Sequence, residues 1–157
     1  MNETPNNNRR VAAATLVASA ATLVGIALNE GYVGTAYKDA VGVSTIGFGE
    51  TKGVKMGQST TPTKALVQLE ESMDAHAKGM VFCIKVPISQ GEYDAYLSFT
   101  YNVGVYAFCH SNVATRLNKG DYEGACKGLL DWDHAGGKRL PGLTKRRQQE
   151  YQECSQG

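Results

Sequence analysis

The sequence predicts an α+β fold, in which a mostly helical domain carries one small β-hairpin near its N-terminal end. Through most of the second half of the chain, apolar residues recur at three- and four-residue intervals, the periodicity of helices. Aromatic and β-branched residues flank a glycine in residues 35–49, as in a hairpin. No internal repeat or low-complexity linker interrupts this pattern. Together these observations favour small sheets next to packed helices.

The hairpin is the first element of the domain. We expect it over residues 35–49, with Gly42 in its turn and space for a third strand behind it. A helix is predicted over residues 60–80, because Pro62 lies near its start and apolar residues then follow at helical spacing. The sheet is therefore small, and the chain returns to helix after it.

The remaining helices are predicted mainly by their capping residues. Ser89 and Glu92 form the capping box of a helix over residues 89–101, which Gly104 ends. The stretch 135–143 reads as a loop, because it holds three glycines and a proline. Further helices are expected after Ser111, from Asp121 to about Trp132, and over residues 144–154.

Composition describes an ordinary globular protein. The chain has 157 residues, of which 42% are hydrophobic and 20% are charged. The net charge of +1 supplies no strong field, so nucleic-acid binding is not expected. The histidines show no metal-ligand spacing, and neither a metal nor a cofactor is predicted. We expect a monomer.

Residues 11–28 form an uncharged segment that is only weakly hydrophobic. Eleven of these 18 residues are Ala, Gly, Ser or Thr, and seven are Val, Leu or Ile. Those seven supply about −2 to −4 kcal/mol of membrane-insertion energy, a marginal amount. Arg9 and Arg10 precede the segment and favour a cytoplasmic N-terminus. We therefore predict a helix that enters a membrane and also leaves it.

Two other interpretations of this segment stay open. A cleaved signal peptide would use Ala18-Ser19-Ala20 as its small-residue site, with a short apolar stretch before it. A buried helix of a soluble domain is also compatible, since Ala-rich helices pack well. On the preferred interpretation, residues 1–28 are a cytoplasmic tip and anchor, and residues 29–157 form a separate domain.

A pair of carboxylates follows the apolar segment. Glu30 comes directly after it, and Asp39 lies nine residues later in the expected hairpin. Glycoside hydrolysis needs one protonated carboxyl group and one ionised carboxylate flanking the scissile bond. Burial against the helix would raise the pKa of Glu30, while a turn beside Thr45 and backbone amides would keep Asp39 ionised. The spacing alone makes this only a hypothesis.

A longer string around these residues is far more specific. It closely resembles the catalytic signature of phage-type lysozymes of glycoside hydrolase family 24, in which Glu is followed by Asp after nine residues and by Thr after six more. The matching blocks span residues 30–154: Glu30-Gly31, Ala36-Tyr37-Lys38-Asp39, Gly42-Val43, Thr45-Ile46-Gly47-Phe48-Gly49, Ser98-Phe99-Thr100-Tyr101-Asn102-Val103-Gly104, Trp132-Asp133-His134-Ala135-Gly136-Gly137-Lys138, Gly142-Leu143, Arg146-Arg147 and Glu150.

The resemblance implies a lysozyme-like fold and the hydrolysis of the β-1,4 bond between N-acetylmuramic acid and N-acetylglucosamine in peptidoglycan. It implies Glu30 as general acid, Asp39 as the carboxylate that supports the cationic transition state or activates water, and Thr45 as the residue that positions this water. The expected contacts with the glycan are Tyr101, Asn102, Gly104, Gly47 and Arg146. For Tyr101, Asn102 and Gly104, a helix end with a packed aromatic is an equal alternative, and core packing is favoured for Trp132.

The resemblance also gives the N-terminal segment and the cysteines an interpretation. Some phage endolysins carry a weakly apolar signal-anchor-release segment of this kind, which implies delivery by the host export machinery and a tether to the periplasmic face of the host inner membrane. Release into the periplasm would then bring Glu30 to its catalytic position.

The four cysteines allow three pairings, and the preferred one is Cys83–Cys109 with Cys126–Cys154. No cysteine precedes Cys83, so the anchor segment contains no thiol that could act as a redox switch.

Other function classes compete with this prediction. A lytic transglycosylase uses a single Glu and forms anhydro-sugar ends, but it needs neither Asp39 nor Thr45. A secreted lysozyme with a cleaved signal peptide shares the catalytic residues and lacks the tether. A wall-binding protein or a membrane-perforating holin leaves the Glu–Asp–Thr string unexplained. Mass spectrometry of the products released from purified peptidoglycan separates a lysozyme from a lytic transglycosylase and from a non-catalytic protein.

Overall fold

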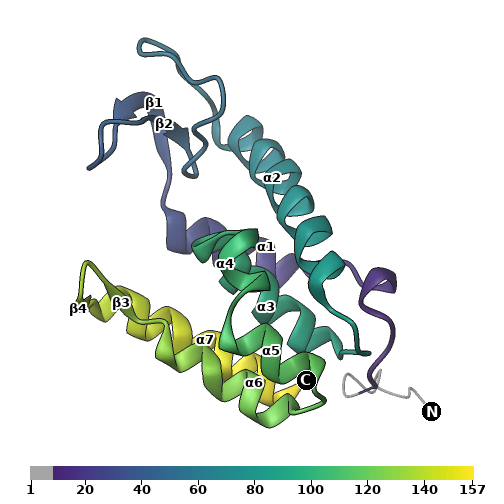
Figure 1. Ribbon diagram of the computed structural model, residues 1–157. Coiled ribbons are helices and arrows are strands. Elements are labelled where there is room, and N and C mark those ends of the chain that lie inside the picture. Colours follow the sequence, from purple (N-terminus) through teal and green to yellow (C-terminus); the bar gives the residue numbers. More distant parts are fainter. Residues whose placement is uncertain (1–8) are drawn as a thin grey trace. The chain divides into compact units, whose positions relative to one another are not determined.

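The computed structural model describes residues 9–157, so the expectation of a polar tip at residues 1–8 lies outside them. The chain divides into two compact units (Figure 1). Unit 1 consists of the described part of Met1–Ser19 together with His76–Gly157, and unit 2 is Ala20–Ala75. The boundary expected between residues 28 and 29 concerns membrane tethering, and it stays a prediction.

Unit 2 contains the predicted hairpin. Helix α1 (Ala20–Glu30) leads into strand β1 (Val33–Lys38), which pairs antiparallel with β2 (Ser44–Gly47). The register places Tyr37 opposite Thr45, with an irregularity between Val33 and Tyr37. The hairpin is confirmed, but the expected third strand amounts to an isolated bridge between Thr35 and Ser59.

Helix α2 (Pro62–Cys83) runs from unit 2 into unit 1. It begins near Pro62 as predicted and ends three residues beyond Met80. Ala65, Leu69 and Met73 are buried at four-residue intervals, whereas Leu66 is exposed. The helical spacing of apolar residues therefore predicts the buried side of α2 at these three positions and not at Leu66.

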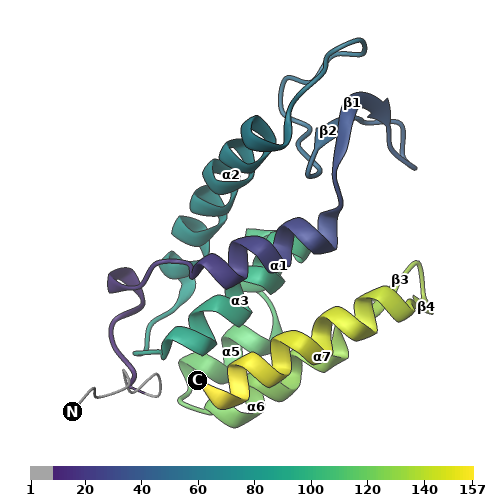
Figure 2. The same cartoon turned by 180° about the vertical axis from the view of Figure 1, so that it is seen from behind.

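Unit 1 is a helical bundle around a buried aromatic core. Helix α3 packs along α7, and α5 packs on α6 (Figures 1 and 2). Tyr96, Phe99 and Phe108 are fully buried, and the Phe108 ring contacts the rings of both Tyr96 and Phe99. Its helices are α3 (Gln90–Val103), α4 (Val105–Cys109), α5 (Asn112–Asn118), α6 (Tyr122–Gly128) and α7 (Pro141–Gln156), with short 3-10 turns η1 (Ala13–Thr15) and η2 (Leu129–Asp131).

The predicted caps are formed at the starts of α3, α5 and α6. Ser89 accepts from the backbone N–H of Glu92 while Glu92 accepts from that of Ser89, so both halves of the capping box of α3 are formed. Ser111 caps α5, and Asp121 caps α6 by accepting from the amide of Gly124. Helix α6 ends at Gly128, earlier than expected, and η2 completes the stretch toward Trp132.

Two segments differ from the expected structure. Residues 11–28 do not form one helix, because η1 and α1 are separated by extended chain. Among residues 9–157, none of the helices has the length and apolar character needed to cross a membrane. The predicted loop 135–143 contains most of a small antiparallel pair, β3 (His134–Ala135) with β4 (Lys138–Arg139), and α7 starts three residues earlier than expected. Consecutive glycines in left-handed backbone form its turn, which explains why the stretch resembles a loop.

Both predicted disulfides are present. Cys83 pairs with Cys109 and joins α2 to α4, with a Cα–Cα distance of 5.5 Å. Cys126 pairs with Cys154 and joins α6 to α7, with a Cα–Cα distance of 5.6 Å. No free cysteine occurs in the described chain, and the preferred pairing is confirmed.

Candidate active site

Glu30, the expected general acid, is the last residue of α1. Gly31 follows in left-handed backbone, with φ of +71°, and its N–H donates to the carbonyl of Ala27 at 3.0 Å. This arrangement ends the helix and turns the chain toward β1. Glu30 is exposed, so the burial expected from its place after an apolar segment is not found.

The chain after Glu30 is held against the turn that follows β2. The Tyr32 hydroxyl donates to the carbonyl of Thr60 at 3.0 Å, and the Tyr32 ring lies 5.4 Å from that of Phe48. Gly49 comes next, with φ of +85°. A Cβ atom on Gly49 would lie 3.4 Å from Oε2 of Glu30, so this turn borders the carboxylate.

Asp39 organises the loop between β1 and β2. Its Oδ1 accepts hydrogen bonds from the backbone N–H groups of Val41 and Val43, at 3.0 and 2.8 Å. Its own N–H donates to the Val43 carbonyl, and its carbonyl accepts from Gly42, whose φ is +82°. Both side-chain bonds use Oδ1, so Oδ2 keeps its lone pairs for another partner.

Thr45 is tied to the same loop through Val43. The Thr45 hydroxyl donates to the Val43 carbonyl at 3.1 Å, and the residue is only 4% exposed. The loop therefore fixes the Asp39 carboxylate and the Thr45 hydroxyl with respect to each other. Glu30, Asp39 and Thr45 all belong to unit 2, with Thr45 near the start of β2 and the Glu30–Gly49 contact just beyond its end.

Gly47, an expected glycan contact, has a clear structural reason to be glycine. Its φ is +66°, and a Cβ atom there would lie 3.0 Å from Cβ of Ala65. A side chain would therefore push β2 away from α2. This close approach agrees with a role in shaping the hairpin, and a contact between Gly47 and sugar stays a prediction.

The expected contacts at the end of α3 lie in unit 1. Tyr101 is half-buried with its ring 4.8 Å from that of His76, and Asn102 is exposed. Gly104 has φ of +93° and donates its N–H to the Thr100 carbonyl at 2.8 Å, as a helix-ending residue does. Their contacts with glycan remain predictions.

Trp132 is part of the packing of unit 1. Its indole N–H donates to Asn112 at 3.0 Å, and its ring packs edge-on against Phe99 with centroids 5.3 Å apart. The favoured expectation of core packing agrees with these contacts.

Arg146 lies among buried partners rather than at the surface. It is 6% exposed, and its guanidinium donates to the Ser98 carbonyl at 3.0 Å and to Glu150 at 3.3 Å. Arg147 is fully buried and pairs with Glu150 at 2.7 Å. Burial lowers the pKa of Arg147 and raises that of Glu150. These contacts disfavour Arg146 as a glycan ligand and make it part of a buried ion network.

Asp133 is a structural residue that sequence reasoning did not single out. It is 3% exposed, pairs with Arg139 at 2.9 Å and with His134 at 2.7 Å, and accepts from the Thr144 hydroxyl. Burial alone would raise its pKa, but the Thr144 hydroxyl and the Arg139 charge hold the pKa below its usual value. Its sequence signals are its place in the block that matches the family signature and its position three residues before the Gly136-Gly137 pair.

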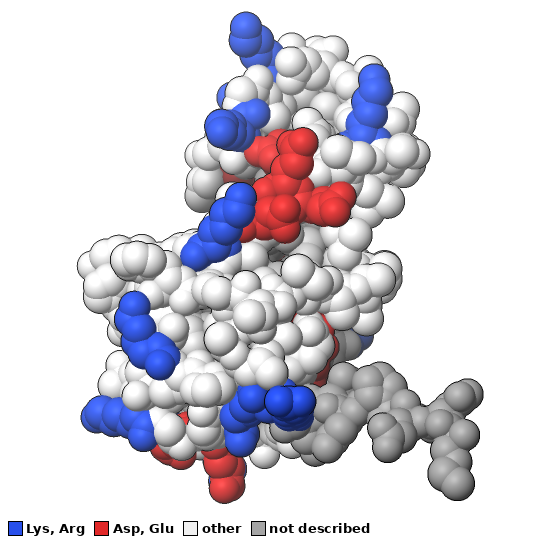
Figure 3. All heavy atoms as spheres, turned by 90° about the vertical axis from the view of Figure 1, so that its right-hand side faces the viewer, with Lys and Arg blue, Asp and Glu red and all other residues white. Residues whose placement is uncertain are grey.

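The face drawn in Figure 3 carries charges of both signs. On the face drawn in Figure 3, Lys and Arg stand in separate groups, and acidic side chains gather between some of them. Among residues 9–157, we find no group of three or more His, Cys, Asp or Glu side chains that could hold a metal ion.

Comparison with known proteins places this arrangement in a family. A sequence model of phage lysozyme matches residues 27–150. The SAR-endolysin of Enterobacteria phage PA-2 is 35% identical, over 98% of this chain and 98% of its own length. The endolysin of Acyrthosiphon pisum secondary endosymbiont phage 1 is 39% identical, over 82% of this chain and 90% of its own length.

Solved structures agree in fold. The endolysin from Escherichia coli O157:H7 phage FAHEc1 is 33% identical with a TM-score of 0.79, and the match covers 88% of this chain and 93% of that one. The muramidase domain of SpmX from Asticaccaulis excentricus is 27% identical with a TM-score of 0.82, over 87% of this chain and 96% of the other. Because the family model spans most of the chain and the relatives align over nearly their whole length, this protein belongs to the phage lysozyme family and is a lysozyme.

Proposed function

We propose that this enzyme hydrolyses the β-1,4 bond between N-acetylmuramic acid and N-acetylglucosamine in peptidoglycan. Glu30 donates the proton to the leaving oxygen. Asp39 supports the positive charge that develops on the sugar or activates the attacking water, and Thr45 positions this water. The observation that carries the proposal is the loop in which Asp39 Oδ1 takes two backbone amides while Oδ2 is left available. The similarity in fold to the muramidase domain of SpmX supports the same bond.

The division of labour follows from the surroundings of each residue. Asp39 is held by two backbone amides at Oδ1, so its carboxylate keeps one orientation and presents Oδ2 to a partner. Gly49 lies beside the Glu30 carboxylate and adds no side chain at that position, which leaves room there for a sugar oxygen. Thr45 cannot rotate away freely, because it is buried and its hydroxyl is bonded to Val43.

Glu30→Gln tests the proposal. The variant keeps the shape of the side chain and loses the proton donor, so we expect lysis of purified peptidoglycan to fall by at least about 10³-fold with an unchanged melting temperature. Mass spectrometry of the wild-type products should show reducing ends. Anhydro-sugar ends would indicate a lytic transglycosylase instead, and a fully active Glu30→Gln would remove the central assignment.

We further propose that residues 11–28 tether the enzyme to the periplasmic face of the host inner membrane before they enter the fold described here. The support is their weak hydrophobicity together with the SAR-endolysin names of relatives aligned along nearly the whole chain. While this segment spans the bilayer, Glu30 stays at the membrane surface, two residues beyond its end. On release, residues 20–30 form α1 and carry Glu30 to the hairpin.

Substitutions at exposed alanines test the tether. Ala12, Ala14 and Ala21 are exposed in the folded enzyme, so leucine is tolerated there. Each leucine adds roughly −0.3 to −0.6 kcal/mol of insertion energy. We expect the triple variant to remain in the membrane fraction of a Gram-negative host after the membrane potential is collapsed, while wild type appears in the periplasm. A periplasmic wild-type protein that begins near Ala21 would instead indicate a cleaved signal peptide.

A further inference from the structure

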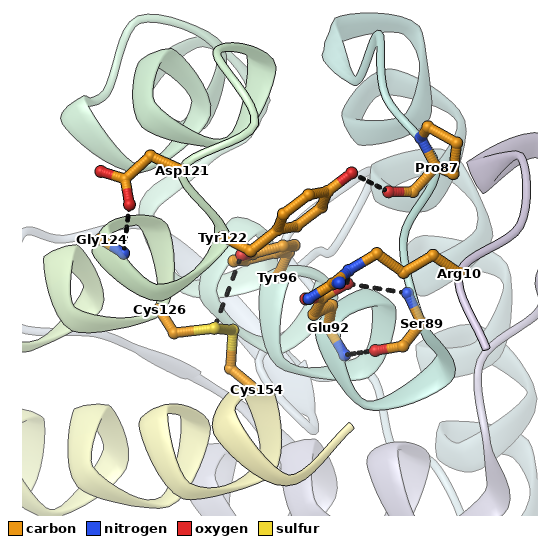
Figure 4. Close-up of polar contacts among 10 residues, drawn as sticks. All are labelled: Arg10, Pro87, Ser89, Glu92, Tyr96, Asp121, Tyr122, Gly124, Cys126 and Cys154. Carbon is orange, nitrogen blue, oxygen red and sulfur yellow. Dashed lines mark hydrogen bonds and ion pairs between the residues drawn. A yellow bond between two sulfur atoms is a disulfide. The ribbon is translucent and has the colours of Figure 1, made fainter. Parts of the chain in front are cut away.

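The segment directly before α1 is bound to unit 1 at its first residues. Arg10 meets the carboxylate of Glu92, with Nε 3.1 Å from both carboxylate oxygens and Nη2 2.7 Å from Oε1 (Figure 4). Next to it, Val11 and Ile88 exchange two backbone hydrogen bonds of 2.9 and 2.8 Å. A forked side-chain contact and a β-bridge thus occur at consecutive residues.

The last residues of the same segment are bound as well. The Gln90 side chain donates to the carbonyl of Val17 at 2.8 Å, and the backbone N–H of Ser19 donates to Asp94 Oδ1 at 3.0 Å. Glu92, Gln90 and Asp94 all belong to the first turns of α3. One helix end therefore holds both ends of residues 10–19.

The Arg10 binding site is organised by bonds that do not involve Arg10. Glu92 accepts from the Ser89 N–H at 2.8 Å as part of the capping box of α3. Tyr122 donates its hydroxyl to the Pro87 carbonyl at 2.8 Å, which fixes the ring against which the guanidinium stacks, 3.7 Å from the ring centroid (Figure 4). Such preorganisation reduces the entropy lost when Arg10 docks.

Glu92 is both charged and buried, so the site needs a cation as its partner. Glu92 is 1% exposed, so its ionised form has lost nearly all hydration. Arg10 is the cation that pairs with it, and this hydrogen-bonded partner raises the pKa of Arg10. Arg9, one residue earlier, is exposed and has no bonding partner in the described chain. The neighbouring arginines therefore differ sharply in their contacts.

We propose that the N-terminal end of α3, together with Tyr122, is a docking site for residues 10–19 of the same chain, with Glu92 as the receptor for Arg10. The consequence for regulation rests on the proposed membrane tether. When residues 11–28 span the bilayer, Arg10 lies at its cytoplasmic surface and cannot reach Glu92. Arg10 therefore cannot dock on Glu92 while residues 11–28 are inserted in the membrane. The free energy of docking shifts the equilibrium between the inserted and the released enzyme toward the released form.

The first experiment uses the purified chain and compares Arg10→Gln with Arg9→Gln. Both variants lose one positive charge before the anchor segment, but only one loses the contact with Glu92. We expect Arg10→Gln to lower the melting temperature by about 5 °C or more and Arg9→Gln to leave it within about 1 °C of wild type. Amide exchange of Val11 and Ile88 should accelerate at least about tenfold in Arg10→Gln alone, with Leu117 in the core as reference.

Glu92→Gln supplies the second half of a double-mutant cycle. It keeps an acceptor for the Ser89 N–H and removes the charge, so the capping box survives. The effects of Arg10→Gln and Glu92→Gln should be strongly non-additive. Additive effects, or equal exchange of Val11 in the Arg9 and Arg10 variants, would overturn the docking site.

The second experiment measures the tethered fraction in a Gram-negative host. Arg10→Gln should delay release from the membrane after depolarisation compared with Arg9→Gln, which matches its charge. Identical release of the two variants, despite different Val11 exchange, would refute the regulatory consequence. Absence of wild type from the membrane fraction would refute the proposed tether, and it would leave the exchange result as the separate test of docking.

Discussion

Oε2 of Glu30 lies 3.4 Å from the position that a Cβ atom would occupy on Gly49, within the same compact unit. Gly49 also has φ of +85°, a conformation that costs other residues free energy. The residue therefore serves the backbone turn after β2 and leaves the space beside the carboxylate open. A methyl group at this position would border the proposed proton donor.

Gly49→Ala tests this relationship against Gly53→Ala. Gly53 has φ of +69° and open space around its hypothetical Cβ, so the two substitutions impose a similar backbone cost of roughly 1–2 kcal/mol. We expect Gly49→Ala to lower kcat/KM on peptidoglycan at least about tenfold beyond Gly53→Ala, at comparable loss of thermal stability. Equal activities of the two variants would show that the space at Gly49 is irrelevant to Glu30.

Asp39→Asn separates the structural and chemical roles of Asp39. Asparagine keeps a side-chain oxygen that can accept from Val41 and Val43, so the loop should retain its geometry. The negative charge is lost, and we expect activity to fall by at least about 10²-fold with a melting temperature close to wild type. Asp39→Ala, which also loses both amide contacts, should be less stable. An active Asp39→Asn variant would assign Asp39 to the loop alone.

The sequence predicts local elements well where one residue decides them. Ser89 with Glu92, Ser111 and Asp121 each act on backbone amides within three residues, and all three caps are formed as expected. The Gly42 turn and the flanking β-branched residues likewise specify the hairpin. These signals are short in range, so no knowledge of tertiary packing is needed.

Features that depend on distant partners are not predictable in this way. Arg146 is expected from the sequence to contact glycan, and its burial becomes visible only when Glu150 and Ser98 are placed beside it. The uniform composition of residues 11–28 suggests one helix, whereas Val11 pairs with Ile88, which is 77 positions later. The position of Glu30 beside Gly49 likewise requires the hairpin to have closed.

The disulfide between Cys126 and Cys154 should stabilise the enzyme without switching it. It joins α6 to α7 across 28 residues of sequence. Replacing both cysteines with serine should cost about 2–4 kcal/mol of unfolding free energy, measured by denaturant titration. Reductant should lower thermal stability and should not raise the activity of the purified enzyme. Activation by reductant would point to a thiol switch.

Glu153 should make stability depend on pH. Burial, followed by the charges of Asp94 and Glu150, raises the pKa of Glu153 to about 7. The folded state binds the Glu153 proton more tightly than the unfolded state does. The contribution of this proton to the free energy of unfolding is therefore fully present below about pH 4.5 and is lost as the pH rises through about 7.

Glu153→Gln removes this loss. The variant should melt at a higher temperature than wild type at pH 8, and the difference should shrink toward pH 5. Glu123→Gln is a suitable control, since Glu123 is an exposed carboxylate that pairs with Lys127. A constant difference between Glu153→Gln and wild type across this range would exclude Glu153 as the titrating group.

Asp133 anchors the β3–β4 hairpin, and its substitution should loosen that hairpin selectively. Residues 134–142 are all exposed, so little apolar burial holds them. The buried carboxylate of Asp133 pairs with Arg139 and accepts from Thr144, and its backbone carbonyl accepts from the Leu140 N–H at 2.9 Å.

Asp133→Asn removes the charge that binds Arg139. We expect amide exchange of Leu140 to accelerate on the order of tenfold while amides in α5 stay protected. Asp131→Asn, at an exposed carboxylate two residues earlier, should leave Leu140 unchanged. Because the folded-state pKa of Asp133 is lowered, its charge contributes fully above about pH 4 and is lost as the pH falls through that lowered pKa, so wild type should approach the variant only in strong acid.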